Sequence, residues 1–174
     1  ISCSLVGSEM CIRDRNDVAL EDLAALTDVF YFGGTKCGAL FGEAVVITAD
    51  ALKKRFKAYM KQNGAVLAKG WLLGLQFHCL LEHDLYFTAT RRADALAMKL
   101  REVFAEQGIP FWVESFTNQQ FVILSDVQKE TLEKRYIFEP MGKSADGGNI
   151  ARFCTSWATT EEEVQTLIDD LRTL

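Results

Sequence analysis

The sequence predicts a protein of the α/β class with a small α+β unit at its C-terminal end. Two β-like runs, Val29–Phe32 and Glu43–Thr48, lie on either side of a glycine-rich turn. The apolar residues of Leu85–Gln107 fall on one stripe, which is typical of a long amphipathic helix. After Pro110, short β-like runs alternate with helical segments. That rhythm predicts helices covering one face of a mainly antiparallel sheet.

The elements before Pro110 are predicted from apolar spacing and from boundary residues. Asn16 or Asp17 can cap the first helix. Gly70 and Gly74 would allow a neighbouring element to approach a strongly apolar helix. In chain order the elements are a helix with Leu20, Leu23 and Leu26 on one face, the two strands, a basic helix over Asp50–Tyr59, a buried helix over Leu67–Leu81 and the amphipathic helix, which ends at Gly108.

The elements after Pro110 follow from short apolar runs and from helix caps. Asp126 can cap a helix that ends near Lys134, and Thr159 or Thr160 can open a capping box for the last helix. The predicted strands are Phe111–Glu114, Gln120–Leu124, Tyr136–Glu139 and Ile150–Ser156. The last helix is predicted to bury Val164, Leu167, Ile168 and Leu171.

Composition limits the classes of function. A net charge of -5 argues against a broad nucleic-acid surface, and no apolar run is long enough to cross a membrane. Cys37, Cys79 and Cys154 are widely spaced and form no disulfide or zinc pattern, so we expect buried thiols, no metal site and a cytoplasmic protein.

Residues 1–15 read poorly as protein. Back-translation of Leu5–Arg15 resembles a transposase adapter used in preparing sequencing libraries, so we expect these residues to be a translated artefact. The chain would then be a C-terminal fragment, without Cys3 and Cys11 as native residues. The predicted division is 1–15 as artefact, 16–84 as part of a large domain, and 85–174 as a long helix with a small α+β domain.

A single lysine, Lys36, lies in the glycine-rich turn. The order Thr-Lys does not match the phosphate-binding pattern Gly-Lys-Ser/Thr, and a GxGxxG dinucleotide pattern is absent. One interpretation is a solvated lysine on a surface hairpin. The other is an amine sheltered by the apolar strands, where desolvation lowers the pKa and favours a nucleophilic amine that forms a Schiff base with a carbonyl cofactor.

The turn also carries a resemblance. DVFYFGGTKCGALFGEAVVI, residues 28–47, resembles the cofactor-lysine segment of the threonine aldolase and aromatic amino acid β-eliminating lyase family. TNQQF at Thr117–Phe121 and ARFCTSWATTEEEV at Ala151–Val164 match in family order. The resemblance runs from about Asp17 to the C-terminus. It implies the C-terminal half of a pyridoxal-phosphate (PLP)-dependent transferase fold of the aspartate aminotransferase type, comprising the end of the large-domain sheet and a small C-terminal domain.

The resemblance also implies roles for three residues. Lys36 would bind PLP covalently, and Arg152 would bind the α-carboxylate of the substrate. Thr35 could contact the cofactor, although a simple turn hydroxyl explains it equally. For Arg152 the alternative is a local ion pair with Glu139 or Asp146. Asn118 matches a family position, and our default for it is a structural role in a turn.

The implied reaction is cleavage of L-threonine or L-allo-threonine to glycine and acetaldehyde by a cytoplasmic homodimer or homotetramer. Family members supply a phosphate loop, a ring-stacking histidine and a pyridine-binding aspartate from their N-terminal half. The fragment is therefore expected to be inactive by itself. A β-eliminating lyase, an aminotransferase and a non-catalytic α/β interaction module remain open as alternatives.

Overall fold

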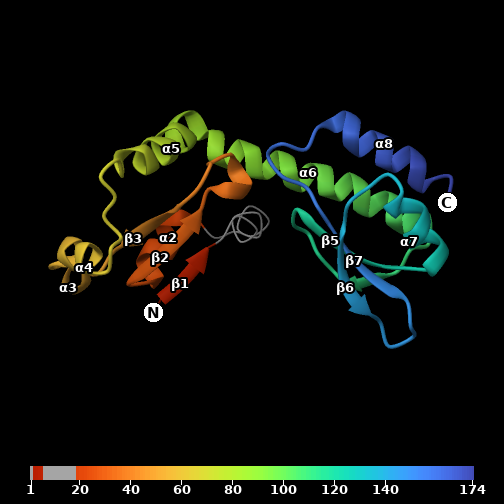
Figure 1. Ribbon diagram of the computed structural model, residues 1–174, viewed down its shortest axis with the longest axis horizontal. Coiled ribbons are helices and arrows are strands. Elements are labelled where there is room, and N and C mark those ends of the chain that lie inside the picture. The colour runs from red at the N-terminus through yellow and green to blue at the C-terminus, as the bar shows by residue number, and fades with distance from the viewer. Residues whose placement is uncertain (1, 6–18) are drawn as a thin grey trace. The chain divides into compact units, whose positions relative to one another are not determined.

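The computed structural model describes residues 2–5, by their backbone alone, and residues 19–174. The chain divides into two compact units, residues 1–90 and 91–174 (Figure 1). None of the helices in the described part is both long and apolar enough to span a bilayer.

The first unit is built on a three-stranded sheet in the order β1-β2-β3. β2 (Val29–Gly33) pairs antiparallel with β3 (Glu43–Ile47), which confirms both predicted strands. β1 (Ser2–Leu5) pairs parallel with β2. It lies within residues 1–15, and the foreign origin of that segment stays a prediction.

Helices pack on this sheet around an aromatic core. α2 (Leu20–Leu26) contains the three leucines of the predicted helix, and its N-cap is Ala19. The predicted caps Asn16 and Asp17 lie outside the described residues. Phe32 makes edge-to-face contacts with Phe77 and Tyr86 at ring separations of 5.8 and 5.7 Å. The buried members of this core are Phe30, Phe32, Cys37, Ala39, Phe77, Leu80 and Tyr86.

The basic segment forms two short helices, and the prediction of one continuous helix was wrong. α3 (Asp50–Lys53) and α4 (Phe56–Gln62) are separated at Arg55, whose φ is 64°. All residues from 50 to 59 are exposed. A helix without a packed apolar face depends on local propensity alone, and short helices are marginal on that basis.

The strongly apolar helix is less buried than predicted. α5 (Trp71–Leu81) buries only Phe77 and Leu80. No heavy atom comes within 4 Å of a Cβ built on Gly74, so the predicted close approach does not occur among the described residues. Cys79 is exposed on this helix, against the expectation of a buried thiol. Most residues of this helix are apolar, but among the described residues only Phe77 and Leu80 are buried by packing partners.

A short 3-10 turn, η2 (Glu82–Asp84), leads into α6 (Leu85–Glu106). The predicted amphipathic helix is confirmed, since Leu96, Leu100, Val103 and Phe104 are buried. Gly108 follows with φ at 66°, as expected for the residue after a helix C-cap.

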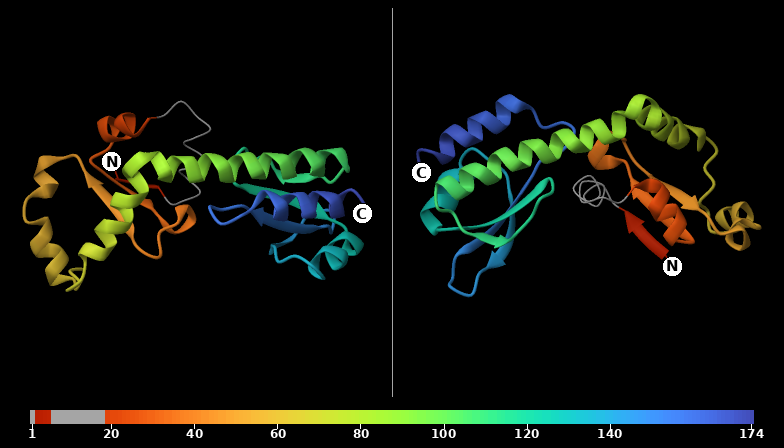
Figure 2. Two further views of the ribbon diagram at one scale, coloured as in Figure 1. Left: turned by 90° about the horizontal axis from the view of Figure 1, so that it is seen from above. Right: turned by 180° about the vertical axis from the view of Figure 1, so that it is seen from behind.

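The second unit contains a four-stranded antiparallel sheet in the order β4-β5-β7-β6. Its strands are β4 (Phe111–Val113), β5 (Gln119–Leu124), β6 (Glu139–Lys143) and β7 (Asn149–Cys154). α7 (Asp126–Glu133) and α8 (Glu161–Leu171) complete the unit. Figures 1 and 2 show α6 and α8 on the same face of the sheet, which confirms the predicted arrangement.

Residue alternation along β5 and β7 defines the two faces of this sheet. Val122, Leu124, Ala151 and Phe153 belong to one core cluster with buried residues of α6, α7 and α8. All four residues predicted for the buried face of α8 are buried. Arg152 and the exposed Cys154 take the opposite face, so the prediction of a buried thiol at Cys154 was wrong.

The start of α7 and the third predicted strand of this unit differ from the prediction, and the ends of the other strands shift by one or two residues. Ser125, not Asp126, is the N-cap of α7, because its hydroxyl accepts a hydrogen bond from the Gln128 amide. β6 begins at Glu139, whereas the strand was predicted over Tyr136–Glu139. The Tyr136 amide donates to the Leu132 carbonyl at 2.8 Å, which continues the end of the helix, and the aromatic side chain packs on the core from this connection.

Candidate functional site

The turn that carries Lys36 is a single 3-10 turn, η1 (Thr35–Cys37), between β2 and β3. The Gly34 carbonyl accepts hydrogen bonds from the amides of Cys37 and Ala39 at 2.9 and 2.8 Å. Gly38 follows with φ at 109°, a conformation that favours glycine. These bonds fix the backbone of the turn, from which the Lys36 side chain projects.

The base of the turn is fixed by the core beneath it. The Tyr86 hydroxyl donates a 2.6 Å hydrogen bond to the Gly33 carbonyl. A Cβ placed on Gly34 would lie 2.6 Å from Cβ of Ala39 and 3.1 Å from the Phe77 ring. Glycine is required at this position by close packing, since no other side chain fits without a shift of its neighbours.

The segment after the turn is held by α5. The side-chain oxygen of Gln76 accepts from the Leu40 amide at 2.7 Å and from the Phe41 amide at 3.4 Å. Gly42 has φ at 92°, and its Cα approaches Leu73 so closely that a Cβ would lie 2.4 Å from Cδ2. The loop therefore packs its backbone on α5 while Leu40 and Phe41 remain exposed.

Thr35 and Lys36 are both exposed. Among the described residues, no hydrogen-bond acceptor or carboxylate pairs with the Lys36 amine. The strands β2 and β3 thus do not shelter the amine, contrary to one of the two interpretations of the sequence. Within the described part of the chain, Lys36 is an accessible amine on a rigid turn.

Arg152 lies on β7, on the sheet face opposite the helices. It is opposite Phe121 of β5 and Glu139 of β6 in the strand register. Its Nη2 forms an ion pair with Glu139, and its Nη1 donates to Oε1 of Gln119 at 3.3 Å. Of the two alternatives, the local ion pair with Glu139 is therefore present, and the carboxylate-binding role stays a prediction.

Asn118 has the structural role that was our default. Its side chain is buried and donates to the Thr155 carbonyl at 2.8 Å. In return, the Thr155 amide donates to the Asn118 carbonyl at 3.0 Å. These bonds join the start of β5 to the chain after β7, and so set the position of the strand that carries Arg152.

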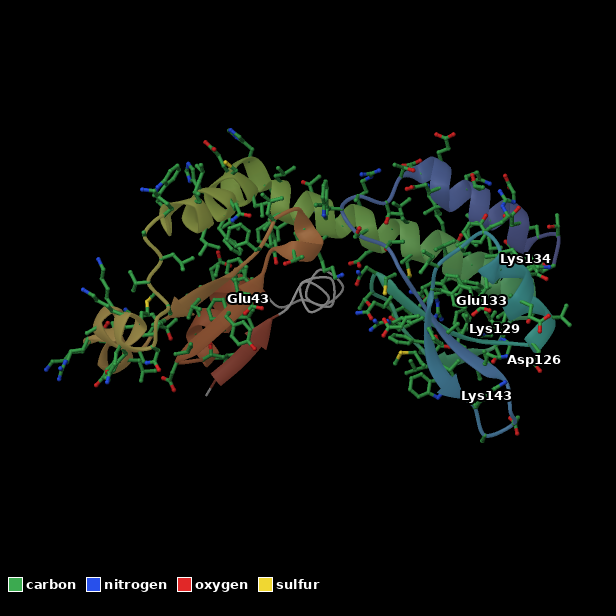
Figure 3. All side chains as sticks on the ribbon, in the orientation of Figure 1. Glu43, Asp126, Lys129, Glu133, Lys134 and Lys143 are labelled. Carbon is green, nitrogen blue, oxygen red and sulfur yellow. The ribbon has the colours of Figure 1, made fainter. Side chains whose placement is uncertain are left out.

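A charged cluster at one end of the second unit joins α7 to the sheet. Asp126 accepts hydrogen bonds from Asn149 at 2.8 Å and from Lys143 at 3.2 Å. These bonds, the one from Asn149 first, lower the pKa of the Asp126 carboxyl. Figure 3 shows Asp126 and Lys143 near one another, with Lys129 and Glu133 close by on α7. The cluster is an ordinary surface network that ties a helix N-terminus to two strands.

Sequence reasoning missed Tyr86, Gln119 and Gln76. Each acts through a contact between residues far apart in sequence, so local spacing gave no signal for it.

Lys36 and Thr35 belong to the first unit and Arg152 to the second. Among the described residues, no three histidine, cysteine or carboxylate side chains gather as a metal site would need.

Comparison with known proteins gives a consistent set of similarities. No family model matches the chain. A low specificity L-threonine aldolase of Pseudomonas aeruginosa is 32% identical over 150 residues, covering 83% of this chain and 41% of the relative. A similar enzyme of a Pseudomonas species is 30% identical over the same length. The chain therefore spans less than half of the curated relatives that it matches.

Solved structures extend the similarity to the fold. The threonine aldolase of Leishmania major matches with a TM-score of 0.91 and 38% identity, over 98% of this chain and 51% of that one. A serine palmitoyltransferase of Sphingomonas wittichii matches with a TM-score of 0.66 at 14% identity, which shows the fold alone. The two units thus have the architecture of part of the PLP-dependent transferase fold.

Proposed function

Because the chain is related to the threonine aldolases in both sequence and fold, we propose that the protein containing it is a PLP-dependent carbon-carbon lyase. Its substrates would be L-threonine, L-allo-threonine or related β-hydroxy amino acids, and its products glycine and an aldehyde. The observation that carries the proposal is the match to the Leishmania enzyme over nearly the whole chain. The exposed Lys36 on the turn after β2 supports the proposal because its amine could bind the PLP aldehyde.

Lys36 is the residue that would hold the cofactor, through its ε-amine. The amine suits this role because it is exposed and has no ionic partner among the described residues. The hydrogen bonds of Gly34 and the Tyr86–Gly33 bond fix the backbone from which it projects. The neighbouring Thr35 hydroxyl is exposed and could donate to the bound cofactor. When bound, PLP supplies an electron sink for the bond that breaks at Cα.

Arg152 would bind the substrate α-carboxylate and so orient the bonds at Cα. A guanidinium group matches a carboxylate with two parallel hydrogen bonds. The Arg152 group already pairs with a carboxylate, that of Glu139, on the sheet face that no helix of its unit covers. Its chemistry and position are therefore compatible with a carboxylate ligand.

Further properties belong to the same proposal. The partner of the protein is a small amino acid, with no role for nucleic acid or a membrane, and the protein acts in the cytoplasm as a homodimer or homotetramer. Since the chain spans only 41% to 51% of the relatives, we also propose that residues 1–174 do not suffice for catalysis. Threonine cleavage at an ordinary rate by the purified 174-residue chain would contradict this part.

Product analysis tests the proposed reaction. The whole protein that contains this chain is supplied with PLP and L-threonine, and we expect glycine and acetaldehyde in equal amounts. A Lys36→Ala variant should form neither. Pyruvate and ammonia from L-serine without aldol products would indicate a β-eliminating lyase, and transfer of the amino group to a keto acid would indicate an aminotransferase. A protein that forms no product and binds no PLP would be a non-catalytic module.

A further inference from the structure

Both Nη atoms of the Arg152 guanidinium already have partners within the chain. Nη2 pairs with the Glu139 carboxylate, and Nη1 donates to Gln119. Nε is buried and has no hydrogen-bond partner among the described residues. An entering carboxylate therefore has to bind through the Nη groups, one of which already holds the Glu139 carboxylate.

The pair between Arg152 and Glu139 is exposed enough to be displaced. The Arg152 side chain is 30% exposed and that of Glu139 is 57% exposed. Exposed ion pairs typically contribute little to stability because water screens the charges and ordering two long side chains costs entropy. Glu139 can thus leave the guanidinium at small cost when another carboxylate arrives.

We propose that Glu139 is an internal competitor that a substrate carboxylate must displace from Arg152, so that Glu139 sets how tightly the amino acid binds. This inference rests on the proposed role of Arg152 as the carboxylate site. When no substrate is bound, the Glu139 carboxylate pairs with the Arg152 guanidinium, which avoids an unpaired cation on the sheet. The same pairing weakens binding of carboxylates that offer no further contacts, and so favours complete amino acids.

Steady-state kinetics of the whole protein with L-threonine tests the inference. Glu139→Gln removes the competing charge and keeps the shape, and we expect KM to fall about two- to fivefold, the range that an exposed ion pair allows, with kcat unchanged. Gln119→Glu places a second carboxylate next to Nη1, and we expect KM to rise. The matched control is Glu114→Gln, because Glu114 forms a similarly exposed pair with Arg101 in the same unit. This control should leave KM unchanged.

The outcomes separate this inference from the proposed function. If Arg152→Gln raises KM strongly while Glu139→Gln leaves KM unchanged or raises it, Glu139 is not a competitor although Arg152 binds substrate. If Arg152→Gln has no effect on KM, the proposed carboxylate site itself is wrong. A double-mutant cycle of Glu139→Gln and Arg152→Gln, measured by urea unfolding of the whole protein, gives an independent readout. We expect a measurable coupling, and its absence would overturn the pairing on which the inference rests.

Discussion

The Tyr86 hydroxyl and the Gly33 carbonyl form a buried 2.6 Å hydrogen bond between the first turn of α6 and the last residue of β2. Gly33 lies three residues before Lys36. The bond therefore fixes the exact end of the strand from which the lysine turn departs, and it links the orientation of that turn to the start of the long helix.

Replacing Tyr86 with Phe should loosen the lysine turn. The Gly33 carbonyl would remain buried without its donor, and we expect a loss of about 1–3 kcal/mol in the free energy of unfolding. Urea unfolding measures this loss, and hydrogen exchange should be faster at the Cys37 and Ala39 amides. Tyr59→Phe, at an exposed tyrosine, is the control and should change neither quantity. Unchanged exchange in Tyr86→Phe would show that the bond does not hold the turn.

Two glycine-to-alanine substitutions should change the free energy of unfolding in opposite directions. In Gly34→Ala the new Cβ would lie 2.6 Å from Cβ of Ala39, so we expect a loss of about 1–3 kcal/mol from overpacking. Gly74 lies within α5, and no atom of another described element comes within 4 Å of the new Cβ, so alanine there should add about 0.5–1 kcal/mol through helix propensity. Thermal or urea unfolding of both variants checks the pair, and equal effects would contradict the packing described around the lysine turn.

The capping box at the N-terminus of α8 should make the free energy of unfolding decrease at acidic pH. The Glu163 carboxylate accepts from the Thr160 amide at 2.8 Å and from its hydroxyl at 2.9 Å, and these bonds, the backbone one first, lower the pKa of Glu163 below 4.5. A lowered pKa contributes stability that is present above 4.5 and is lost as the pH falls through the folded value. Glu163→Gln should therefore flatten the acid limb of the unfolding free energy against pH. Glu162→Gln, outside the capping box, is the control, and equal acid limbs in all three proteins would refute the linkage.

Tyr136 should have the corresponding effect at alkaline pH. Burial first, and then its hydrogen bond to Asp170, raise the pKa of Tyr136 from 10.0 to about 12. The unfolded chain then loses the phenolic proton before the folded chain does, so this stability is complete below pH 10 and disappears as the pH rises toward 12. Tyr136→Phe should be less stable at neutral pH and should show a shallower decline in that window. An unchanged alkaline slope in Tyr136→Phe would contradict the linkage.

Local sequence patterns correctly predicted the elements whose apolar residues are buried by other parts of this chain. The stripe of α6 and the four buried residues of α8 follow from spacing, and the structure confirms them. The resemblance around Lys36 agrees with the threonine aldolase relatives. These features need only local periodicity or a continuous motif.

Features that depend on distant partners could not be predicted. Spacing indicated that α5 is apolar, but not that only Phe77 and Leu80 are buried among the described residues. Spacing also predicted a strand at Tyr136, where the backbone still continues the end of the preceding helix. The Tyr86–Gly33 bond and the contacts of Arg152 with Gln119 and Glu139 join residues 13 to 53 positions apart. No local pattern encodes such pairs.

The central claim is that Lys36 holds the cofactor, and chemical trapping tests it most directly. The whole protein is incubated with PLP, reduced with borohydride and digested, and mass spectrometry locates the pyridoxyl group. We predict stoichiometric labelling of Lys36 and its loss in Lys36→Arg, which keeps the charge but not the nucleophilic amine. Labelling confined to other lysines, or undiminished in Lys36→Arg, would contradict the claim.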